Sequence, residues 1–488
     1  MTATAFVPSF TEFLRLLPEI LLVLAGTVVL VLEASGGGRR ARGLGRLSLI
    51  GLGAALAGAV VAHRQPGPAF SELVVSDGFA TFFRVIVIVV GALVVLFSGP
   101  YLRRESAERG EYYALLLYSV AGQCLMASAA ELITLFIALE ISSIASYVLA
   151  GYLRADRRAN EAAVKYFLLG SFATAFLLYG VALTYGAAGS TWLTEIRRAL
   201  AAPAAAPGML VGAAAALIFV GFAFKVSAAP FQVWAPDVYQ GAPAPVAAFL
   251  SAGPKAAAFA GLLRVFMTAF EPVGAQWESV VWTSALATMV IGNFAALLQS
   301  NIKRLLAYSS IAHAGYVMVA VAAQSSVGAA AAMFYLAAYV FMNVGAFAVV
   351  SYFARQGERY VNVEDLAGLG WRQPAVAALL SVFLLSLIGV PLTGGFFGKF
   401  YVFKAALEAD LVWLTVLGLL NSVVAAYYYL RIIVVMYMHE PVEAVTDLPV
   451  PETALKTTLW ASALATVALG VFPSAILDFA TRAAKLAP

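Results

Sequence analysis

Long apolar runs separated by short polar segments repeat along the whole chain. Each run has roughly 20 residues, which is enough for an α-helix to cross about 30 Å of hydrocarbon. The weak alternation over about ten residues that is typical of a membrane β-barrel strand is absent. The pattern therefore predicts an all-α polytopic membrane protein with about 14 spans. The expected spans are 12–34, 45–63, 79–100, 112–130, 131–153, 162–187, 208–240, 243–269, 277–299, 302–323, 326–354, 374–407, 411–437 and 456–479.

The seventh and twelfth spans are too long for one straight crossing. Each has a proline near its middle, Pro230 in one and Pro391 in the other. Proline and glycine at mid-depth leave backbone groups free, which is tolerated only where protein or water satisfies them. We expect both helices to be broken beside an internal pathway.

Two similar segments indicate an internal repeat. The letters SSIA occur at 142–145 in the fifth span and again at 309–312 in the tenth. The distance to the helix-breaking proline is about the same in both cases, and an odd number of spans separates the copies. We expect two inverted five-helix repeats, spans 4–8 and 9–13, as in many transporters. The expected division is a three-helix segment at 1–110, repeats at 111–270 and 271–440, and a C-terminal helix at 441–488.

Basic residues gather in alternate loops. By the positive-inside rule these loops face the cytoplasm. With an even number of spans, both termini then lie on the non-cytoplasmic side. The acidic loop 438–455 breaks the pattern. The basic loops contain Arg39, Arg40, Arg42, Arg46, Arg103, Arg104, Arg109, Arg154, Arg157, Arg158, Lys303, Arg304, Arg355, Arg359 and Arg372.

Composition supports the membrane assignment and limits the kinds of binding site that we expect in the chain. Hydrophobic residues make up 62% of the 488 positions and charged residues 11%. The net charge of +4 gives little reason to expect a nucleic-acid partner. Cys124 is the one cysteine, so neither an internal disulfide nor a cysteine-based metal cluster is expected. The three histidines have no ligand spacing, and we expect no metal or cofactor in this chain.

Several ionisable residues fall inside the expected spans, where each costs several kcal/mol and therefore needs a reason. Lys165 could instead extend to the membrane surface, and His313 could be a packing histidine. Lys303 and Arg304 are expected to be positive-inside anchors, and Arg84 and Arg431 interface charges. The candidates for proton transfer are Glu140, Lys165, Lys225, Lys255, His313 and Lys399.

A row of buried amines suits proton transfer. An amine held away from water gives up its proton more easily, whereas a nearby carboxylate favours its charged form. Glu140 and Lys225 are the natural pair, and they would titrate together. Oxygen-rich clusters suited to sodium or calcium are missing, and so are a nucleophilic triad and a phosphate-binding loop. We expect protons to move along lysines and water.

Five separated motifs resemble the antiporter-like membrane subunits of respiratory complex I. The segments PFQVWAPDVYQGAPAPVAAFLS, LLAYSSIAHAGYV and GVPLTGGFFGKFYVF carry the general resemblance. Within that group, LLPEILL at 16–22 and EAAVKYFLLGSFATAFLLYG at 161–180 are similar to the subunit N family of bacterial NADH–quinone oxidoreductase. The resemblance covers essentially the whole chain.

The resemblance implies 14 helices, with a proton half-channel in each repeat and a hydrophilic axis joining them. By matching position, Glu140 and Lys225 correspond to the family's glutamate–lysine pair, Lys255 to its connecting lysine and Lys399 to its exit-side lysine. The resemblance also gives roles to Lys165 on the sixth helix and to His313 in the axis. Pro254 replaces a small polar residue of related subunits, and we expect it to distort the helix beside Lys255.

The resemblance also implies which subunits bind the cofactors and which partners surround this chain. NADH, FMN, iron–sulfur clusters and quinone would be bound by other subunits, so this chain would hold no redox centre. Its partners would be the neighbouring antiporter-like subunit M, small subunits such as K and J, the lateral helix of subunit L, and lipid of the bacterial cell membrane. Three alternatives are a subunit of a multi-subunit sodium/proton antiporter, a membrane subunit of a hydrogenase or formate-lyase, and a passive scaffold.

Overall fold

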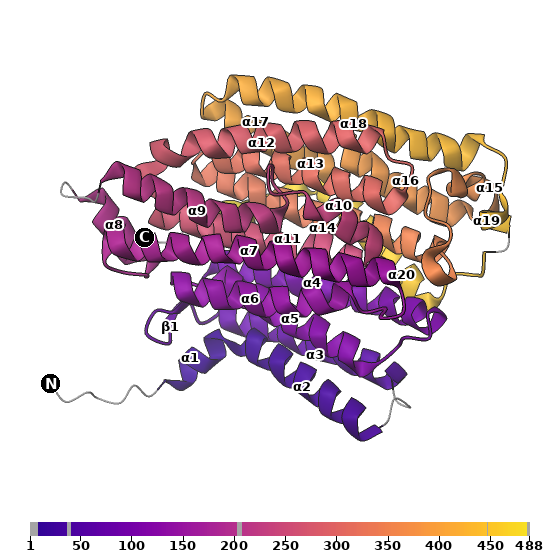
Figure 1. Ribbon diagram of the computed structural model, residues 1–488, viewed down its shortest axis with the longest axis horizontal. Helices are drawn as coiled ribbons and strands as arrows, with labels where there is room; N and C mark the ends of the chain where they lie inside the picture. The colour runs from indigo at the N-terminus through magenta and orange to yellow at the C-terminus, as the bar shows by residue number, and fades with distance from the viewer. Residues whose placement is uncertain (1–7, 37–40, 203–206, 447, 486–488) are drawn as a thin grey trace.

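The structure is a computed structural model that describes residues 8–36, 41–202, 207–446 and 448–485. Nearly all of it is helix, and the long helices run beside one another (Figure 1). Residues up to Ala269 form α1 (Phe10–Arg15), α2 (Leu17–Gly36), α3 (Ala41–His63), β1 (Gly67–Ala69), β2 (Val74–Ser76), α4 (Gly78–Arg104), α5 (Gly110–Ser128), α6 (Leu132–Ala150), α7 (Arg157–Ala188), α8 (Leu193–Ala201), α9 (Gly208–Val226), α10 (Trp234–Gly241), α11 (Ala244–Arg264) and η1 (Val265–Ala269).

The rest of the chain supplies the remaining helices, of which α12 and α18 lie at the top of Figure 1 and α14 lies near its middle. Its elements are η2 (Glu271–Val273), α12 (Gly274–Leu297), α13 (Ile302–Ala322), α14 (Ser326–Phe353), η3 (Gln356–Glu358), η4 (Glu364–Leu366), α15 (Leu369–Arg372), α16 (Pro374–Ile388), α17 (Gly394–Glu408), α18 (Val412–Met438), α19 (Glu443–Thr446), α20 (Thr453–Val471) and α21 (Pro473–Ala483).

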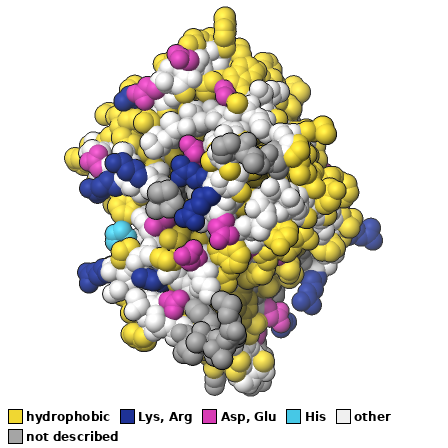
Figure 2. Space-filling view, turned by 90° about the vertical axis from the view of Figure 1, so that its left-hand side faces the viewer, with side chains coloured by type: hydrophobic (Ala, Val, Ile, Leu, Met, Phe, Trp, Pro, Cys, Tyr) yellow, Lys and Arg dark blue, Asp and Glu magenta, His cyan; other side chains and the backbone are white. Residues whose placement is uncertain are grey.

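Among the described residues, 12 helices are long and apolar enough to cross a membrane. Figure 2 shows one end of the molecule, where charged side chains gather in the middle and hydrophobic side chains cover the flanks. A polar end beside apolar flanks suits a bundle that spans a bilayer. The all-α polytopic fold is confirmed, whereas the count of 14 spans, the inverted repeats and the division at 110, 270 and 440 stay predictions.

Three helices form the centre of the bundle. The apolar stretches of α11, α13 and α14 are almost wholly buried, whereas those of α2 and α7 are mostly exposed. A helix that is apolar all round belongs inside the protein, where it packs against other helices on every side. The polar side chains in the middle of α11 and α13, such as Lys255 and His313, are therefore buried inside the protein.

The seventh expected span is broken, as predicted. Helix α9 ends at Val226 and α10 begins at Trp234, and Pro230 lies between them. The freed backbone is satisfied by α12. Thr288 Oγ1 accepts from the Ala229 N–H at 2.7 Å, and Ser284 donates its hydroxyl to the Ala229 carbonyl at 2.5 Å.

The twelfth expected span is also broken, between Ile388 at the end of α16 and Gly394 at the start of α17. Gly389 has φ +96°, a left-handed conformation that glycine adopts without strain. The Gly395 N–H donates to the Ser386 hydroxyl at 3.1 Å. Side chains thus replace the missing helical hydrogen bonds at both breaks.

Two expected spans differ from the structure at their ends. The first, 12–34, is divided at Leu16 because Pro18 in the first turn of α2 has no N–H to continue the preceding helix. The last, 456–479, is divided at Phe472 because Pro473 starts α21 and disfavours helical geometry in the residue before it. Arg39 and Arg40 lie outside the described residues.

Arg84 was expected at an interface, and this expectation is wrong. It is 1% exposed inside the protein, and its Nε donates to Glu19 Oε1 at 2.8 Å. Its helix, α4, is apolar on every face, so the sequence pattern cannot show which face the arginine occupies.

Candidate functional site

Lys225 lies one residue before the end of α9, beside the first break, and is 8% exposed. Its amine is 3.4 Å from the Tyr147 hydroxyl. It also lies over the rings of Tyr147 and Tyr166, at 4.9 and 5.0 Å from their centroids. Aromatic faces attract an ammonium without supplying a full counter-charge. The sequence therefore placed this lysine correctly in the interior.

Glu140 is less enclosed than its expected depth suggested. It is partly exposed on α6, on the same side as the exposed residues Ile137, Ile141 and Ile144. Its Oε1 accepts from the Thr174 hydroxyl at 2.9 Å. Among the described residues, no ion pair within 4.0 Å joins Glu140 to Lys225 or to any other cation. The carboxylate thus lies on the outer face of this chain, near the lysine but separate from it.

Lys165 does not lie in the buried row. Its side chain is 41% exposed, and its amine contacts Asp237 and Glu161, each at 2.7 Å. Asp237 also binds Arg304 at 2.6 Å. Two carboxylates and a second cation make this a partly exposed ion-pair network rather than an isolated amine.

Lys255 lies in the centre of the bundle, on α11, and is 2% exposed. Its amine donates to the Ser310 carbonyl at 2.8 Å and to the Ser310 hydroxyl at 2.5 Å. Pro254 was expected to distort the helix, but α11 runs through it without a break. The lysine therefore reaches α13 from a continuous helix.

His313 is held between two tyrosines. Its Nδ1 is 2.6 Å from the Tyr335 hydroxyl on α14, and its Nε2 is 3.1 Å from the Tyr429 hydroxyl on α18. The Tyr429 hydroxyl also contacts Ser309. Both ring nitrogens of a 2% exposed histidine are therefore hydrogen-bonded to groups that can donate or accept.

Lys399 lies on α17 beside the second break and is 7% exposed. Its amine donates to the Ile388 carbonyl, at the end of α16, at 2.8 Å. The same amine lies 4.7 Å from the ring centroid of Tyr316, whose hydroxyl accepts from Asn293 Nδ2 at 3.2 Å. A lysine that binds the last carbonyls of a helix is favourably placed against the helix dipole.

Comparison with known proteins identifies the relatives of this chain. The family model described as "NADH:quinone oxidoreductase/Mrp antiporter, TM" matches residues 129–425. NADH-quinone oxidoreductase subunit N 1 of Solibacter usitatus is 62% identical, with 98% of each chain covered. The chain belongs to the NADH–quinone oxidoreductase subunit N family.

Solved structures agree with membership of the subunit N family. A chain of respiratory complex I from Thermus thermophilus, solved with bound aureothin, is 37% identical with a TM-score of 0.81. The match covers 95% of this chain and 99% of that chain. A chain of the Mrp complex from Dietzia sp. is 23% identical with a TM-score of 0.85, covering 98% and 97%. At that identity the second match shows a shared fold alone.

Tyrosines and serines complete the site of this subunit N family member, and sequence reasoning missed them. Ser310 and His313 were visible in the repeated SSIA segment and the histidine after it, but Ser310 was not assigned a role. Nothing in the sequence marks Tyr335 and Tyr429 as partners of His313, because tyrosines occur throughout the apolar spans. Only packing shows which hydroxyls face the lysines and the histidine.

Other buried polar atoms lie along the same row. The hydroxyls of Tyr239 and Tyr339 are buried near Ser310, and neither has a hydrogen-bond partner among the described residues. Buried polar groups without a protein partner are places where ordered water binds. In the part of the chain that the structure describes, no group of three or more His, Cys, Asp or Glu could hold a metal ion.

Proposed function

We propose that this chain moves protons across the membrane along Lys225, Lys255, His313 and Lys399, as a subunit of an NADH–quinone oxidoreductase. The observation that carries the proposal is Lys255. Its amine is enclosed, and both of its acceptors belong to Ser310, which is neutral. A buried charge without a counter-charge is costly, so burial favours the neutral form of the Lys255 amine. The amine can therefore release its proton.

The arrangement also supports a path between the two breaks. Lys225 lies at the first break and Lys399 at the second, and Lys255 on α11 and His313 on α13 lie in the buried centre of the bundle. Tyrosine and serine hydroxyls contact Lys225, Lys255 and His313, whereas Lys399 binds the Ile388 carbonyl and lies over the Tyr316 ring. Water would bridge the remaining gaps. Glu140 at the outer face would act on Lys225 across space, and Lys165 would act at the rim rather than in the row.

We propose further that quinone reduction in another part of the complex drives proton movement along this row of residues. NADH, FMN, iron–sulfur clusters and quinone would be bound by other subunits, and this chain would respond through its neighbours. The exposed stripe of α6 that carries Glu140 would face such a neighbour, for example the small subunits K and J. Subunit M and the lateral helix of subunit L would cover other flanks. The setting would be a bacterial cell membrane, with both termini on the non-cytoplasmic side.

The test replaces Lys225 or Lys255 with alanine in the assembled complex and follows NADH-driven proton uptake in sealed vesicles. Because the alanine cannot hold a proton, we expect translocation to fall about tenfold or more, together with quinone reduction. Lys456→Ala is the matched control, since Lys456 is exposed on α20. Normal assembly with an unchanged rate of quinone reduction and an unchanged proton-to-electron ratio in both variants would support a passive scaffold instead.

A sodium/proton antiporter is the second candidate, because the matching family model also covers Mrp antiporters. Vesicles that contain such a subunit would move protons when sodium is added, without NADH. We expect no sodium-driven proton movement here. A signal that depends on sodium and is lost in Lys225→Ala would favour the antiporter.

A further inference from the structure

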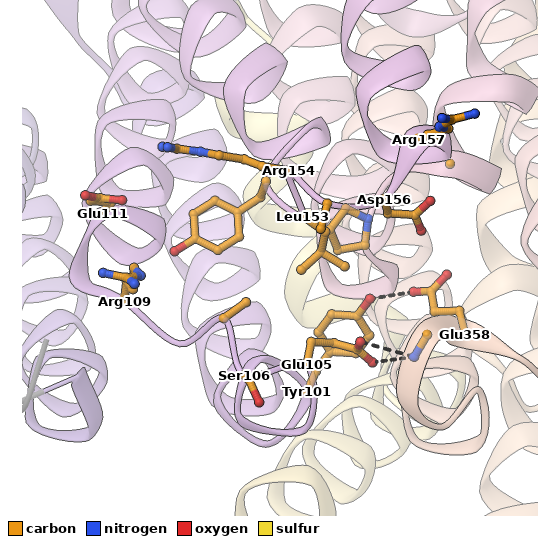
Figure 3. A pocket seen from close by; sticks show the side chains of 16 residues that line it. Tyr101, Glu105, Ser106, Arg109, Glu111, Leu153, Arg154, Asp156, Arg157 and Glu358 are labelled. Carbon is orange, nitrogen blue, oxygen red and sulfur yellow. Dashed lines mark hydrogen bonds between the residues drawn. The ribbon is translucent and has the colours of Figure 1, made fainter.

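A cavity of about 980 Å³ opens at the end of the molecule where the basic loops meet. Its walls come from the segments after α4 and α6, the start of α11 and the turn after α14 (Figure 3). Arg154, Arg157 and Asp156 line one side, and Glu105, Tyr101 and Glu358 line the other. The cavity contains charged groups of both signs and is wide enough for water.

Glu358 lies in the wall of this cavity, yet its side chain is only 10% exposed. It accepts from the Tyr101 hydroxyl and from the Ala244 N–H, each at 2.8 Å. Its second oxygen lies 2.5 Å from the amine of Lys303. Glu358 therefore joins the cavity to a lysine that lies further inside.

Lys303 was expected to be a surface anchor, and this expectation is wrong. Its side chain is 1% exposed, and besides Glu358 it donates to the Ala242 carbonyl at 2.6 Å. Ala242 lies at the junction of α10 and α11. The amine thus lies behind Glu358 as seen from the cavity, at the start of the helix that carries Lys255.

Lys303 lies on the same face of α13 as Ser310, which binds Lys255 of α11. Ser310 follows Lys303 by seven residues, which is about two helical turns or 10 Å along the axis. Ser310 binds Lys255 through both of its oxygens. The buried hydroxyl of Tyr239, on α10, lies near Ser310 and has no hydrogen-bond partner among the described residues, as is typical of groups that bind ordered water.

We propose that Glu358 and Lys303 form a proton port that connects the cavity to Lys255. The proposal rests on the proposed function, since it assumes that Lys255 carries protons. The ammonium of Lys303 gives a proton inward, through water and the Tyr239 hydroxyl, to the neutral amine of Lys255. Hydronium in the cavity then protonates the Glu358 carboxylate and leaves water, and Glu358 passes this proton to the neutral amine of Lys303. The ion pair is thereby restored, and Lys255 passes its own proton on toward His313, so charge and protons balance after each cycle.

Glu105 supports the port from the same wall as Glu358. Its carboxylate accepts from the Gly357 N–H at 3.0 Å, directly beside Glu358 in the chain. Burial raises the pKa of Glu105, and the nearby Glu358 carboxylate acts in the same direction. A carboxyl group that takes up protons more readily than an exposed glutamate suits the mouth of such a port.

The test compares Glu358→Gln with Glu358→Asp in the assembled complex, with Glu364→Gln as the matched control. The glutamine keeps an oxygen for Tyr101 and Ala244 but cannot carry a proton. We expect Glu358→Gln to lower proton translocation about tenfold and Glu358→Asp to keep most of it. Glu364 is exposed and pairs with Arg431, so its change should leave translocation intact. Equal translocation in Glu358→Gln and the parent overturns the port.

Lys255→Ala in the same preparation distinguishes a failure of the proton port from a failure of the proposed function. If Lys255→Ala stops translocation while Glu358→Gln does not, the port is wrong and the proposed function stands. If neither variant changes translocation, the proposed function fails as well.

A second measurement covers the case in which Glu358→Gln does not assemble. Cysteine at Ala155, in the cavity wall, is treated with a bulky thiol reagent that does not cross membranes. We expect the treated Ala155→Cys complex to lose most of its translocation, whereas a treated Glu440→Cys complex keeps it. Complete reaction of Ala155→Cys without loss also overturns the port.

Discussion

At the scale of single residues, His313 shows how the site can relay a proton. A neutral imidazole has one donor and one acceptor nitrogen, and a tyrosine hydroxyl can play either part. With Tyr335 on Nδ1 and Tyr429 on Nε2, one hydroxyl can donate a proton to one ring nitrogen while the other accepts the proton of the second nitrogen, which exchanges the tautomers without moving the ring. The histidine can thus receive a proton on one side and release one on the other.

The first prediction removes one of these hydroxyls. Tyr335→Phe leaves the ring in place but takes away the partner of Nδ1, so the tautomer can no longer be exchanged through that side. We expect proton translocation to fall about fivefold, which corresponds to about 1 kcal/mol in the barrier, while the complex assembles normally. Translocation is measured in sealed vesicles with a pH-sensitive dye.

Tyr427→Phe is the control for this prediction. Tyr427 lies two residues before Tyr429 on α18 and is 65% exposed, so it makes no contact with the histidine. A similar loss in Tyr427→Phe and Tyr335→Phe would contradict a specific role for the His313 hydrogen bonds.

The sequence predicted the depth of Lys225, Lys255 and Lys399 but not the faces of Glu140 and Lys165. Depth follows from counting residues from the ends of an apolar run. The face does not, because lipid-facing and core-facing positions are both apolar in a membrane helix, so the 3.6-residue period carries little contrast. Glu140 on α6 was therefore expected to be as enclosed as Lys255, and Lys165 on α7 could be placed either inside or at the membrane surface, whereas both are partly exposed.

At the scale of elements, the two broken helices place Lys225 and Lys399 beside their breaks. Pro230 and Pro391 made the breaks predictable, because a proline inside a helix removes a hydrogen bond and both spans were too long for one straight crossing. The groups that satisfy the freed backbone were not predictable. Thr288 and Ser284 come from α12, far from Ala229 in sequence, and only folding brings them together.

The second prediction concerns Gly389, whose φ of +96° ends α16. Alanine is strained at this angle, and its Cβ would lie 3.2 Å from Lys399 Cδ. We expect Gly389→Ala to cost about 1 to 3 kcal/mol of stability and to lower proton translocation by displacing the amine from the Ile388 carbonyl. The melting temperature of the purified complex and vesicle assays measure the two effects.

Gly186→Ala is the matched control, because Gly186 is helical in α7 and no atom lies within 4 Å of an added Cβ. Alanine favours a helix over glycine, so this variant should be as stable as the parent or slightly more so. If Gly389→Ala behaved like Gly186→Ala, the geometry of the second break would not matter for Lys399.

At the scale of the whole molecule, the described basic loops meet at one end. Arg104 donates to the Ser351 carbonyl at 2.9 Å and Arg158 to the Gly357 carbonyl at 3.1 Å, which ties the segments after α4, before α7 and after α14 together. The cavity of the proposed port opens at this same end. By the positive-inside rule it would face the cytoplasm, where protons are taken up.

The last prediction tests this orientation with single cysteines. Gln356 is exposed at the basic end, and Glu72 is exposed in the turn of the β1–β2 hairpin before α4. The 27 residues of α4 place about 40 Å between the hairpin and the basic end, so the two sites should lie on opposite sides of a bilayer. Native Cys124 is buried and should not react.

In inside-out vesicles, a thiol reagent that does not cross membranes should label Gln356→Cys and spare Glu72→Cys, as judged by the mass of this chain alone. In right-side-out vesicles the pattern should reverse. If Glu72→Cys were the accessible position in inside-out vesicles, the basic end would face outward. The cavity at Glu358 would then release protons instead of taking them up, and the same residues would work as an exit, because a chain of hydrogen-bonded acids and amines conducts in whichever direction the gradient and its coupling impose.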